Sequence, residues 1–361
     1  MISDALTGSM RSGFILALFL CLILVPAQAQ DSQFSQFYAN PLYLNPALTG
    51  SHAGTFRLTA NYRTQWGASL ERPFTTLSAG GDIKFPIQSG QFSRGNDILA
   101  AGLLFFTDRQ ALFEYNTNSI SLFTAFHKIL SKKTNQYLSA GFQLGLGQRG
   151  VNYENLTFED QFDGVNQYNL PTSEILPGNS IAYPDFSLGL HYSITPNTNR
   201  GVYVGLAYHH WNQPNVSFFD RDTRTTEDYE GFNLESKLTA HVSTSFPINR
   251  QAAIQPRAIF ISQGQASTAW LGGNLKGDLE DSDDVSLHFG FWVRASDDLS
   301  SFEPTDFILS FAYEKSGLIV GVSYDSHLRK LSSEWLGRGT IEFSVSYVGE
   351  HENENEICPE F

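Results

Sequence analysis

The side chains of this chain that could do chemistry are its nine histidines, its serines and two acidic clusters. None of them falls in a G-x-S-x-G, Walker or H-E-x-x-H pattern, the spacings that create a nucleophile, a phosphate cradle or a zinc site. His209 and His210 are adjacent, and neighbouring residues of a strand point to opposite faces, so we do not expect them to share an ion. Their place beside Trp211, at a strand end, is better explained by an aromatic belt at a membrane interface.

The other candidates for binding chemistry also have simple explanations. Two acidic clusters, at 220–230 and 278–284, lack the ordered D-x-[DN]-x-[DN]-G pattern of a calcium loop, so we interpret them as solvated loops. Four further histidines fall on separate expected strands and are interpreted as polar residues facing an interior: His127, His191, His241 and His288. We therefore expect no catalytic residue, no metal site, no cofactor and no enzymatic activity.

The composition of the 361 residues indicates which class of protein must carry these side chains. Charged residues make up only 17% of the chain, whereas soluble domains have about 25%. Aromatic residues reach 14%, yet the mean hydropathy of −0.21 is far below that of a helical membrane protein. This combination fits a transmembrane barrel, in which only every second strand residue meets lipid. The net charge of −14 argues against a nucleic-acid partner.

The first 29 residues have the pattern of a secretory signal peptide. An apolar run at 14–25 follows Arg11, and Ala27-Gln28-Ala29 supplies small residues for cleavage before Gln30. Cys21 would leave with this peptide, so Cys358 alone remains and no intramolecular disulfide is expected. After the signal there is no apolar run of about 18 residues, so we expect no transmembrane helix.

Strict alternation of apolar and polar residues recurs along the chain. Ile341, Phe343 and Val345 alternate with Glu342 and Ser344, so Val345 is expected to face lipid and Ser344 the interior. The same rule places Val204 on the lipid face. Several of these segments end in Tyr, Trp or His, which is typical of an interfacial aromatic girdle.

This alternation predicts an all-β fold, a transmembrane antiparallel β-barrel of about 14 strands. Its strands are expected near 55–66, 73–85, 97–108, 116–129, 135–149, 182–194, 200–211, 237–247, 252–262, 267–276, 285–294, 305–314, 317–326 and 338–348. If the first strand runs outward, the long joins at 150–181 and 212–236 lie outside the cell and both termini are periplasmic. A soluble sandwich or solenoid is the alternative, but sandwich strands are usually about 5–6 residues long.

The segment between the signal and the first strand, residues 30–54, is too apolar to hang free in the periplasm. Its Asn-Pro steps break regular structure, and its aromatic and leucine residues need cover. We expect either a plug or collar in the lower opening of the barrel, which spans 55–348, or a plain linker. An acidic tail, 349–361, follows the last strand; its apolar end is interpreted as a frayed end or as a docking peptide for a periplasmic partner.

Several motifs carry a resemblance to a known family. The mature chain opens with DSQFSQFYANPLYLNPALTG, followed by Asn61-Tyr62-Arg63 and Gln65-Trp66; near the other end, Tyr324-Asp325 leads through Gly337-Arg338-Gly339 to IEFSVSY. Together with the terminal Cys358-Pro359 and Phe361, these resemble the PorP/SprF family of Bacteroidota, although Glu360 replaces the Arg common in family tails. The motif residues singled out as partner-binding candidates are Phe34, Tyr38, Asn45, Pro46, Arg63, Trp66, Cys358, Pro359 and Phe361.

The resemblance implies an outer-membrane component of the type IX secretion system, which exports adhesins, hydrolases and gliding-motility proteins. Such a barrel is a non-enzymatic binding partner for secretion or surface anchoring. Some members are general parts of the machine, and others are dedicated to one large secreted protein. The implied partners are therefore periplasmic or outer-membrane secretion components in the first case, or one large secreted adhesin-like protein in the second, together with outer-membrane lipid. A passive transporter for small or hydrophobic solutes and an outer-membrane hydrolase are the competing functions.

Overall fold

The structure, a computed structural model, describes residues 31–67, 70–87, 97–110, 115–154, 156–174, 176–197, 200–218, 232–279, 285–297, 301–328 and 339–350. The described residues from Ser32 onward form one compact unit. Within the described part, none of the helices is long and apolar enough to cross a membrane. The signal peptide, the tail beyond residue 350 and most of the two acidic clusters lie outside the described residues, so the division of the chain into these segments stays a prediction.

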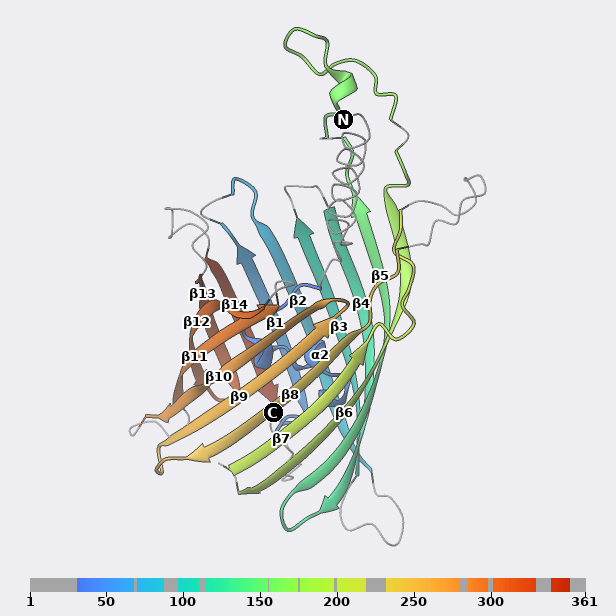
Figure 1. The fold of residues 1–361 in the computed structure, drawn as a ribbon. Coiled ribbons are helices and arrows are strands. Elements are labelled where there is room, and N and C mark those ends of the chain that lie inside the picture. Colours follow the sequence, from blue (N-terminus) through green and yellow to red (C-terminus); the bar gives the residue numbers. More distant parts are fainter. Residues whose placement is uncertain are drawn as a thin grey trace, which may run out of the picture. The chain divides into compact units, whose positions relative to one another are not determined.

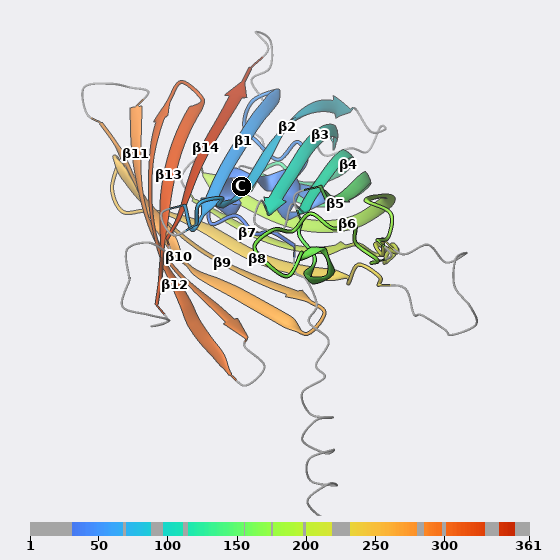
Figure 2. The ribbon, with the colours of Figure 1, turned by 90° about the horizontal axis from the view of Figure 1, so that it is seen from above.

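Fourteen antiparallel strands form a closed barrel, in which β1 pairs with both β2 and β14 (Figures 1 and 2). The strands are β1 (Phe56–Gln65), β2 (Phe74–Ile87), β3 (Asp97–Gln110), β4 (Tyr115–Ser131), β5 (Gln136–Val151), β6 (Ser180–Asn197), β7 (Arg200–His209), β8 (Lys237–Pro247), β9 (Ala252–Gln263), β10 (Ala266–Asp278), β11 (Val285–Asp297), β12 (Phe302–Lys315), β13 (Leu318–His327) and β14 (Thr340–Gly349). The predicted fold class and strand number are confirmed, and the expected bounds differ by three residues or fewer.

Alternation along each strand divides the side chains between the two faces of the wall. On β1, Leu58 is 54% exposed on the outer face, whereas Asn61 is 1% exposed inside. The predicted faces of Val204, Val345 and Ser344 are confirmed, because both valines are exposed and the serine is buried. The bilayer requires an apolar outer face, and a hydrated lumen requires a polar inner face. Alternation lets a single strand provide both.

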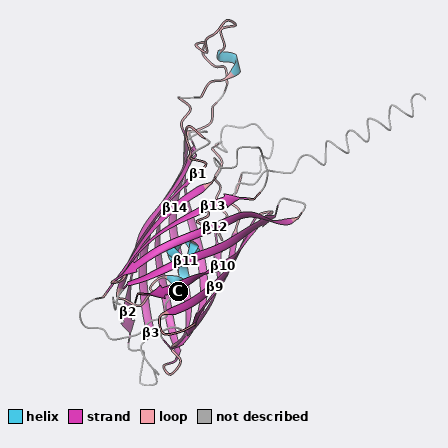
Figure 3. Cartoon of the chain, turned by 90° about the vertical axis from the view of Figure 1, so that its left-hand side faces the viewer, coloured by secondary structure: helices cyan, strands magenta, loops and turns pink. Residues whose placement is uncertain are grey.

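The two ends of the barrel differ. At the end reached by the odd-numbered strands, the long-loop end, the connections at 152–179 and 210–236 are long, and the first contains the 3-10 helix η3 (Glu159–Gln161; Figure 3). At the opposite end, the short-turn end, β12 and β13 are joined by Ser316 and Gly317 alone. Exposed tyrosines mark both ends: Tyr62, Tyr208 and Tyr324 toward the long loops, Tyr313 and Tyr347 toward the short turns. They form an aromatic girdle at each end, of the kind that the strand ends predicted.

The adjacent histidines need a correction. The strand predicted over 200–211 ends at His209, and His210 follows it with a positive φ of 55°, so the two rings do not simply point to opposite faces of a strand. His210 turns back to Asp185, with 2.8 Å between Nδ1 and Oδ1, while buried His209 points inward. Only Trp211, which is exposed, fits the interfacial belt.

Candidate functional site

Residues 32–54 lie inside the barrel, where the helices appear within the ring of strands (Figures 2 and 3). The segment is built from the short elements η1 (Phe37–Ala39), α2 (Pro41–Leu44) and η2 (Pro46–Leu48). Each Asn-Pro step starts a helical turn, because proline suits the first helical position, where its missing N–H would be unpaired. Asn45 also caps η2, its Oδ1 accepting from the Ala47 N–H at 2.9 Å. We call residues 32–54 the lumen segment.

Apolar contacts supply most of the adhesion between the lumen segment and the wall. Phe37, Leu44 and Leu48 pack in one cluster with four residues of β9–β12, namely Ile259, Trp270, Trp292 and Ile308. On the opposite wall, Leu42 contacts Leu104 and Phe123, and the Tyr43 ring stacks on Phe106. Burying one such side chain contributes about 1.5–3 kcal/mol, against about 0.5–1.5 kcal/mol for a hydrogen bond. Apolar burial therefore holds the segment, and polar contacts select its position.

Asn45 is the polar centre of this packing. It is 0% exposed, and its Nδ2 lies 3.1 Å from the Leu190 oxygen, 3.3 Å from the Leu206 oxygen and 3.1 Å from His241 Nε2. Because an amide nitrogen carries two hydrogens, two of these three contacts can be donated at once. The side chain therefore lies against β6, β7 and β8 and bonds to two of these strands at a time.

Glycines in the wall make this approach possible. A Cβ at Gly141 would lie 2.3 Å from the Pro46 carbonyl carbon, and one at Gly189 would lie 2.0 Å from Asn45 Oδ1. Any larger residue would push the segment away. The sequence around Gly141 and Gly189 could not show that their close neighbour is a distant part of the chain.

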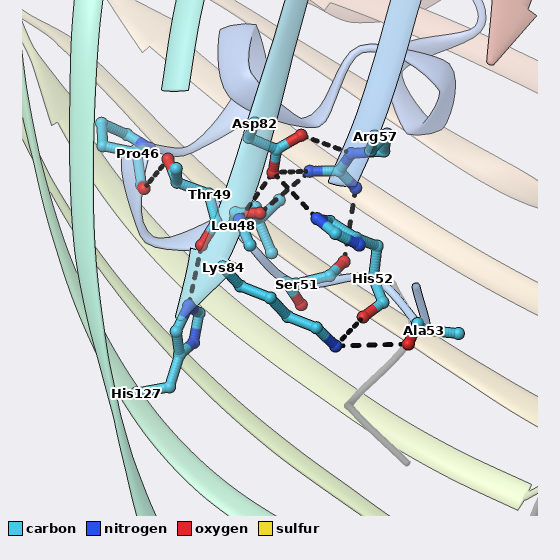
Figure 4. Close-up of polar contacts among 11 residues, drawn as sticks. Pro46, Leu48, Thr49, Ser51, His52, Ala53, Arg57, Asp82, Lys84 and His127 are labelled. Carbon is cyan, nitrogen blue, oxygen red and sulfur yellow. Dashed lines mark hydrogen bonds and ion pairs between the residues drawn. The ribbon is translucent and has the colours of Figure 1, made fainter. Parts of the chain in front are cut away.

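A charged cluster fixes the last turn of the segment before β1 (Figure 4). Arg57 Nη2 donates to Asp82 Oδ2 at 2.7 Å, and the same oxygen accepts from the Gly50 N–H at 2.6 Å. Lys84 donates to the His52 oxygen at 3.0 Å, and His127 Nε2 lies 2.7 Å from the Thr49 oxygen. Side chains of β1, β2 and β4 thereby bind backbone groups of residues 48–53. Substitutions of the segment's side chains would leave these backbone groups in place.

His52 stays uncharged within this cluster. Burial, followed by the nearby cations Arg57 and Lys84, lowers its pKa to about 2. The imidazole therefore adds no positive charge beside Asp82, although Nε2 lies only 3.7 Å from the Asp82 carboxylate. The charge pairing at this site is between Arg57 and Asp82.

A second polar group holds the start of the segment. The Glu342 carboxylate, which is fully buried, accepts from the Ser35 N–H at 2.7 Å and the Gln36 N–H at 2.9 Å. Ser35 Oγ donates to Asp325 at 2.5 Å, and Asp325 also pairs with Arg294. Arg63 donates to the Gln33 oxygen at 2.7 Å. The charged side chains of Glu342 and Arg63 thus form hydrogen bonds with backbone N–H and C=O groups of the lumen segment. These bonds are needed because the segment is irregular and cannot satisfy its own backbone groups.

Together these contacts join the lumen segment to every strand of the barrel. One contact residue from each strand, in order from β1 to β14, is Arg57, Ser78, Phe106, His127, Gly141, Leu190, Leu206, His241, Ile259, Trp270, Trp292, Ser310, Asp325 and Glu342.

The motif residues chosen from the sequence fall into three groups. Phe34, Tyr38, Asn45 and Pro46 belong to the lumen segment, and the structure brings Arg63 to its first residues. Trp66 lies apart at the long-loop end, edge-on to Phe74 with 5.2 Å between ring centroids. Cys358, Pro359 and Phe361 lie outside the described residues, and their role as partner contacts stays a prediction.

The described residues contain no group of three or more His, Cys, Asp or Glu side chains able to hold a metal ion. The interior histidines instead bind the lumen segment or the wall: His209 Nε2 lies 3.3 Å from the Leu44 oxygen, and His288 Nε2 lies 2.7 Å from Glu314. The polar groups of the interior therefore bind the lumen segment and hold it inside the barrel.

Replacing Asn45 by Ala is expected to lower the free energy of unfolding by about 1–2 kcal/mol, because the cap of η2 and the contacts with β6–β8 are lost together. Chemical unfolding in detergent micelles, followed by tryptophan fluorescence, measures the change. The exposed loop residue Asn169, changed to Ala in the same way, is the matched control. An unfolding midpoint equal to that of the unchanged chain would contradict the role of Asn45.

A closed barrel with an apolar outer face, aromatic girdles and a polar lumen defines an outer-membrane protein. The family model for the type IX secretion system membrane protein PorP/SprF matches residues 27–347, and the chain belongs to this family. The resemblance read from the sequence motifs is confirmed. No curated protein matches the chain.

Solved structures to which the chain is similar include a hydrocarbon channel and a toluene transporter. The chain is similar to the "TodX monoaromatic hydrocarbon channel deltaS2 mutant", with a TM-score of 0.50 and 11% identity over 87% of this chain and 94% of that one. It is also similar to the P. putida toluene transporter TodX, with a TM-score of 0.47 and 11% identity over 86% and 93% of the two chains. At such low identity, the likeness shows the fold alone.

Proposed function

We propose that this protein is a non-enzymatic binding component of the type IX secretion system, serving the secretion or surface anchoring of exported adhesin-like or gliding-motility proteins. Membership of the family supports the association with secretion. The observation that supports binding rather than conduction is the lumen segment, which contacts all fourteen strands.

Passive transport, the alternative, requires a path through the lumen. A solute would have to displace a segment fixed by buried leucines, aromatic rings and paired charges, each contributing of the order of 1 kcal/mol or more. A lumen segment that is bound this firmly makes the barrel wall rigid. A rigid barrel can present its loops and rims to partner proteins in a fixed arrangement. We propose that the long-loop end faces outward, because long connections usually lie outside in such barrels, and that both termini are periplasmic.

Secretion in a strain that lacks the gene is the direct test. We expect one or more surface or secreted proteins to disappear from the cell surface and medium, and the unchanged gene to restore them.

A gene ending after Glu350 tests the tail. Reduced recovery of periplasmic secretion components in pull-downs, with a folded barrel, would support docking by residues 351–361. Normal secretion with the truncated gene would remove the tail from the proposal.

The competing function has its own measurement. Purified protein in planar bilayers is expected to show little conductance, whereas a variant lacking residues 32–50 opens the lumen. Solute-selective conductance by the unchanged chain, together with normal secretion in the deletion strain, would overturn the binding function and favour transport.

A further inference from the structure

A cavity of about 580 Å³ lies between the lumen segment and the wall formed by β9–β14 and β1. Ser316, Gly317 and Glu350 belong to its lining, so it reaches the short-turn end of the barrel. Its volume is in the range of small-molecule sites, about 300–1,000 Å³. Apolar groups of Ala312, Ile319 and Val348 share the lining with charged side chains.

Most charges of this cavity are already matched. Arg57 pairs with Asp82, as described above. Glu314 accepts from Lys276 at 2.9 Å and from His288 at 2.7 Å, so these groups neutralise one another within the wall. An anion entering the cavity would have to break such pairs to bind these groups.

Arg257 differs from these cations. It is 8% exposed and lines the cavity, yet it forms no ion pair with a described carboxylate. Its Nε donates to Ser243 at 3.1 Å and its Nη2 to Gln255 at 3.3 Å, while Nη1 is buried without a partner among the described residues. Its carbon Cζ lies 4.7 Å from the centroid of the Tyr38 ring.

A buried cation without a counter-ion is costly, and proteins usually pair such a charge. Arg294 on β11 shows the usual solution in this same barrel, where Asp306 and Asp325 both pair with it. At Arg257 the protein supplies neutral partners and an aromatic face instead, and the residue lines a cavity. The counter-ion is therefore missing from the described chain, although space for it is present.

We propose that this cavity binds a carboxylate, with the Arg257 guanidinium as its charge partner and the Tyr38 ring as its wall. The guanidinium fork suits the planar carboxylate, with which it forms parallel hydrogen bonds. A single unmatched positive charge favours a monoanion over a phosphate dianion. The apolar lining suits a ligand with a hydrocarbon or aromatic body.

Binding of 4-fluorobenzoate to the full chain in detergent micelles, followed by fluorine NMR line broadening, tests the site. We expect binding by the unchanged protein, at least a tenfold loss of affinity in Arg257→Gln, and partial retention in Arg257→Lys. Arg200→Gln, which removes an exposed charge, is the matched control and is expected to bind normally. Each variant is first checked for heat-modifiable migration in SDS, the sign of a closed barrel.

The neutral analogue 4-fluorobenzyl alcohol separates charge recognition from simple apolar binding. Equal binding of the alcohol and the carboxylate, unchanged affinity in Arg257→Gln, or absence of binding by both the unchanged chain and a chain ending after Glu350 would each overturn the proposal. The binding test is independent of the proposed role in secretion. Binding is measured with purified protein, whereas the secretion role is tested by protein export in cells.

Two sources could supply the carboxylate: a solute, or the acidic residues 351–361 that follow Glu350 at the cavity lining. A chain ending after Glu350 distinguishes them. At least tenfold tighter binding of the probe would support the site and assign its occupant to the chain's own acidic residues. Unchanged affinity would support the site and assign it to a carboxylate from outside the chain.

Discussion

Replacing Asp82 by Asn is expected to lower the free energy of unfolding by about 3–5 kcal/mol, since it leaves the buried Arg57 guanidinium without its counter-ion. Asp82 accepts from Arg57 and from the Gly50 N–H, so the substitution weakens both the β1–β2 wall and the lumen segment. Arg57 Nη2 and Asp82 Oδ2 lie 2.7 Å apart, and both side chains are buried. Without the Asp82 charge, the desolvation cost of burying the Arg57 charge is no longer offset. Unfolding midpoints and the fraction of heat-modifiable barrel measure the loss.

A double-mutant cycle identifies the origin of this effect. Arg57→Met combined with Asp82→Asn is expected to cost less than the sum of the two single changes, because the double variant contains no unpaired charge. Glu174→Gln, which removes an acid exposed in a loop, is the matched control and is expected to change stability by less than about 0.5 kcal/mol. Additive single effects would show that the Arg57–Asp82 pair is not coupled.

The second large effect is expected on the lipid face. Val345→Arg should cost about 2–4 kcal/mol and reduce assembly, because it places a charge in the apolar band. Val345 is exposed near the middle of β14, on the outer face. The yield of heat-modifiable protein after refolding into lipid vesicles reports the change.

Ser346→Arg, one residue further along β14, is the matched control. Ser346 lines the interior cavity, where an arginine head can remain hydrated. Ser344 would serve less well, since its Oγ donates to Gln36 at 2.8 Å and an arginine there would displace the lumen segment. If Ser346→Arg impaired assembly more than Val345→Arg, the assignment of the two faces would be wrong.

The barrel could be predicted from the sequence alone. Lipid on one face and a polar lumen on the other impose a period of two on every strand, and that constraint is local enough to be seen residue by residue. It therefore predicted all fourteen strands, the aromatic girdles and the inward direction of residues such as His127 and His241. The motif spacing added the family, and the apolar character of 30–54 indicated that this segment needed cover.

Which residues cover this segment becomes visible only in the folded barrel. The alternation shows that Glu342 points inward, but not that it meets the backbone of Ser35, 307 residues away in the chain. Likewise, nothing local to Gly189 or Asp82 indicates that Asn45 and Gly50 lie against them. Closing the barrel brings all inward side chains to one axis, and the identity of their neighbours depends on strand register and on the path of the lumen segment. Those are long-range properties, so the binding geometry, including the unmatched charge of Arg257, emerges only in the folded chain.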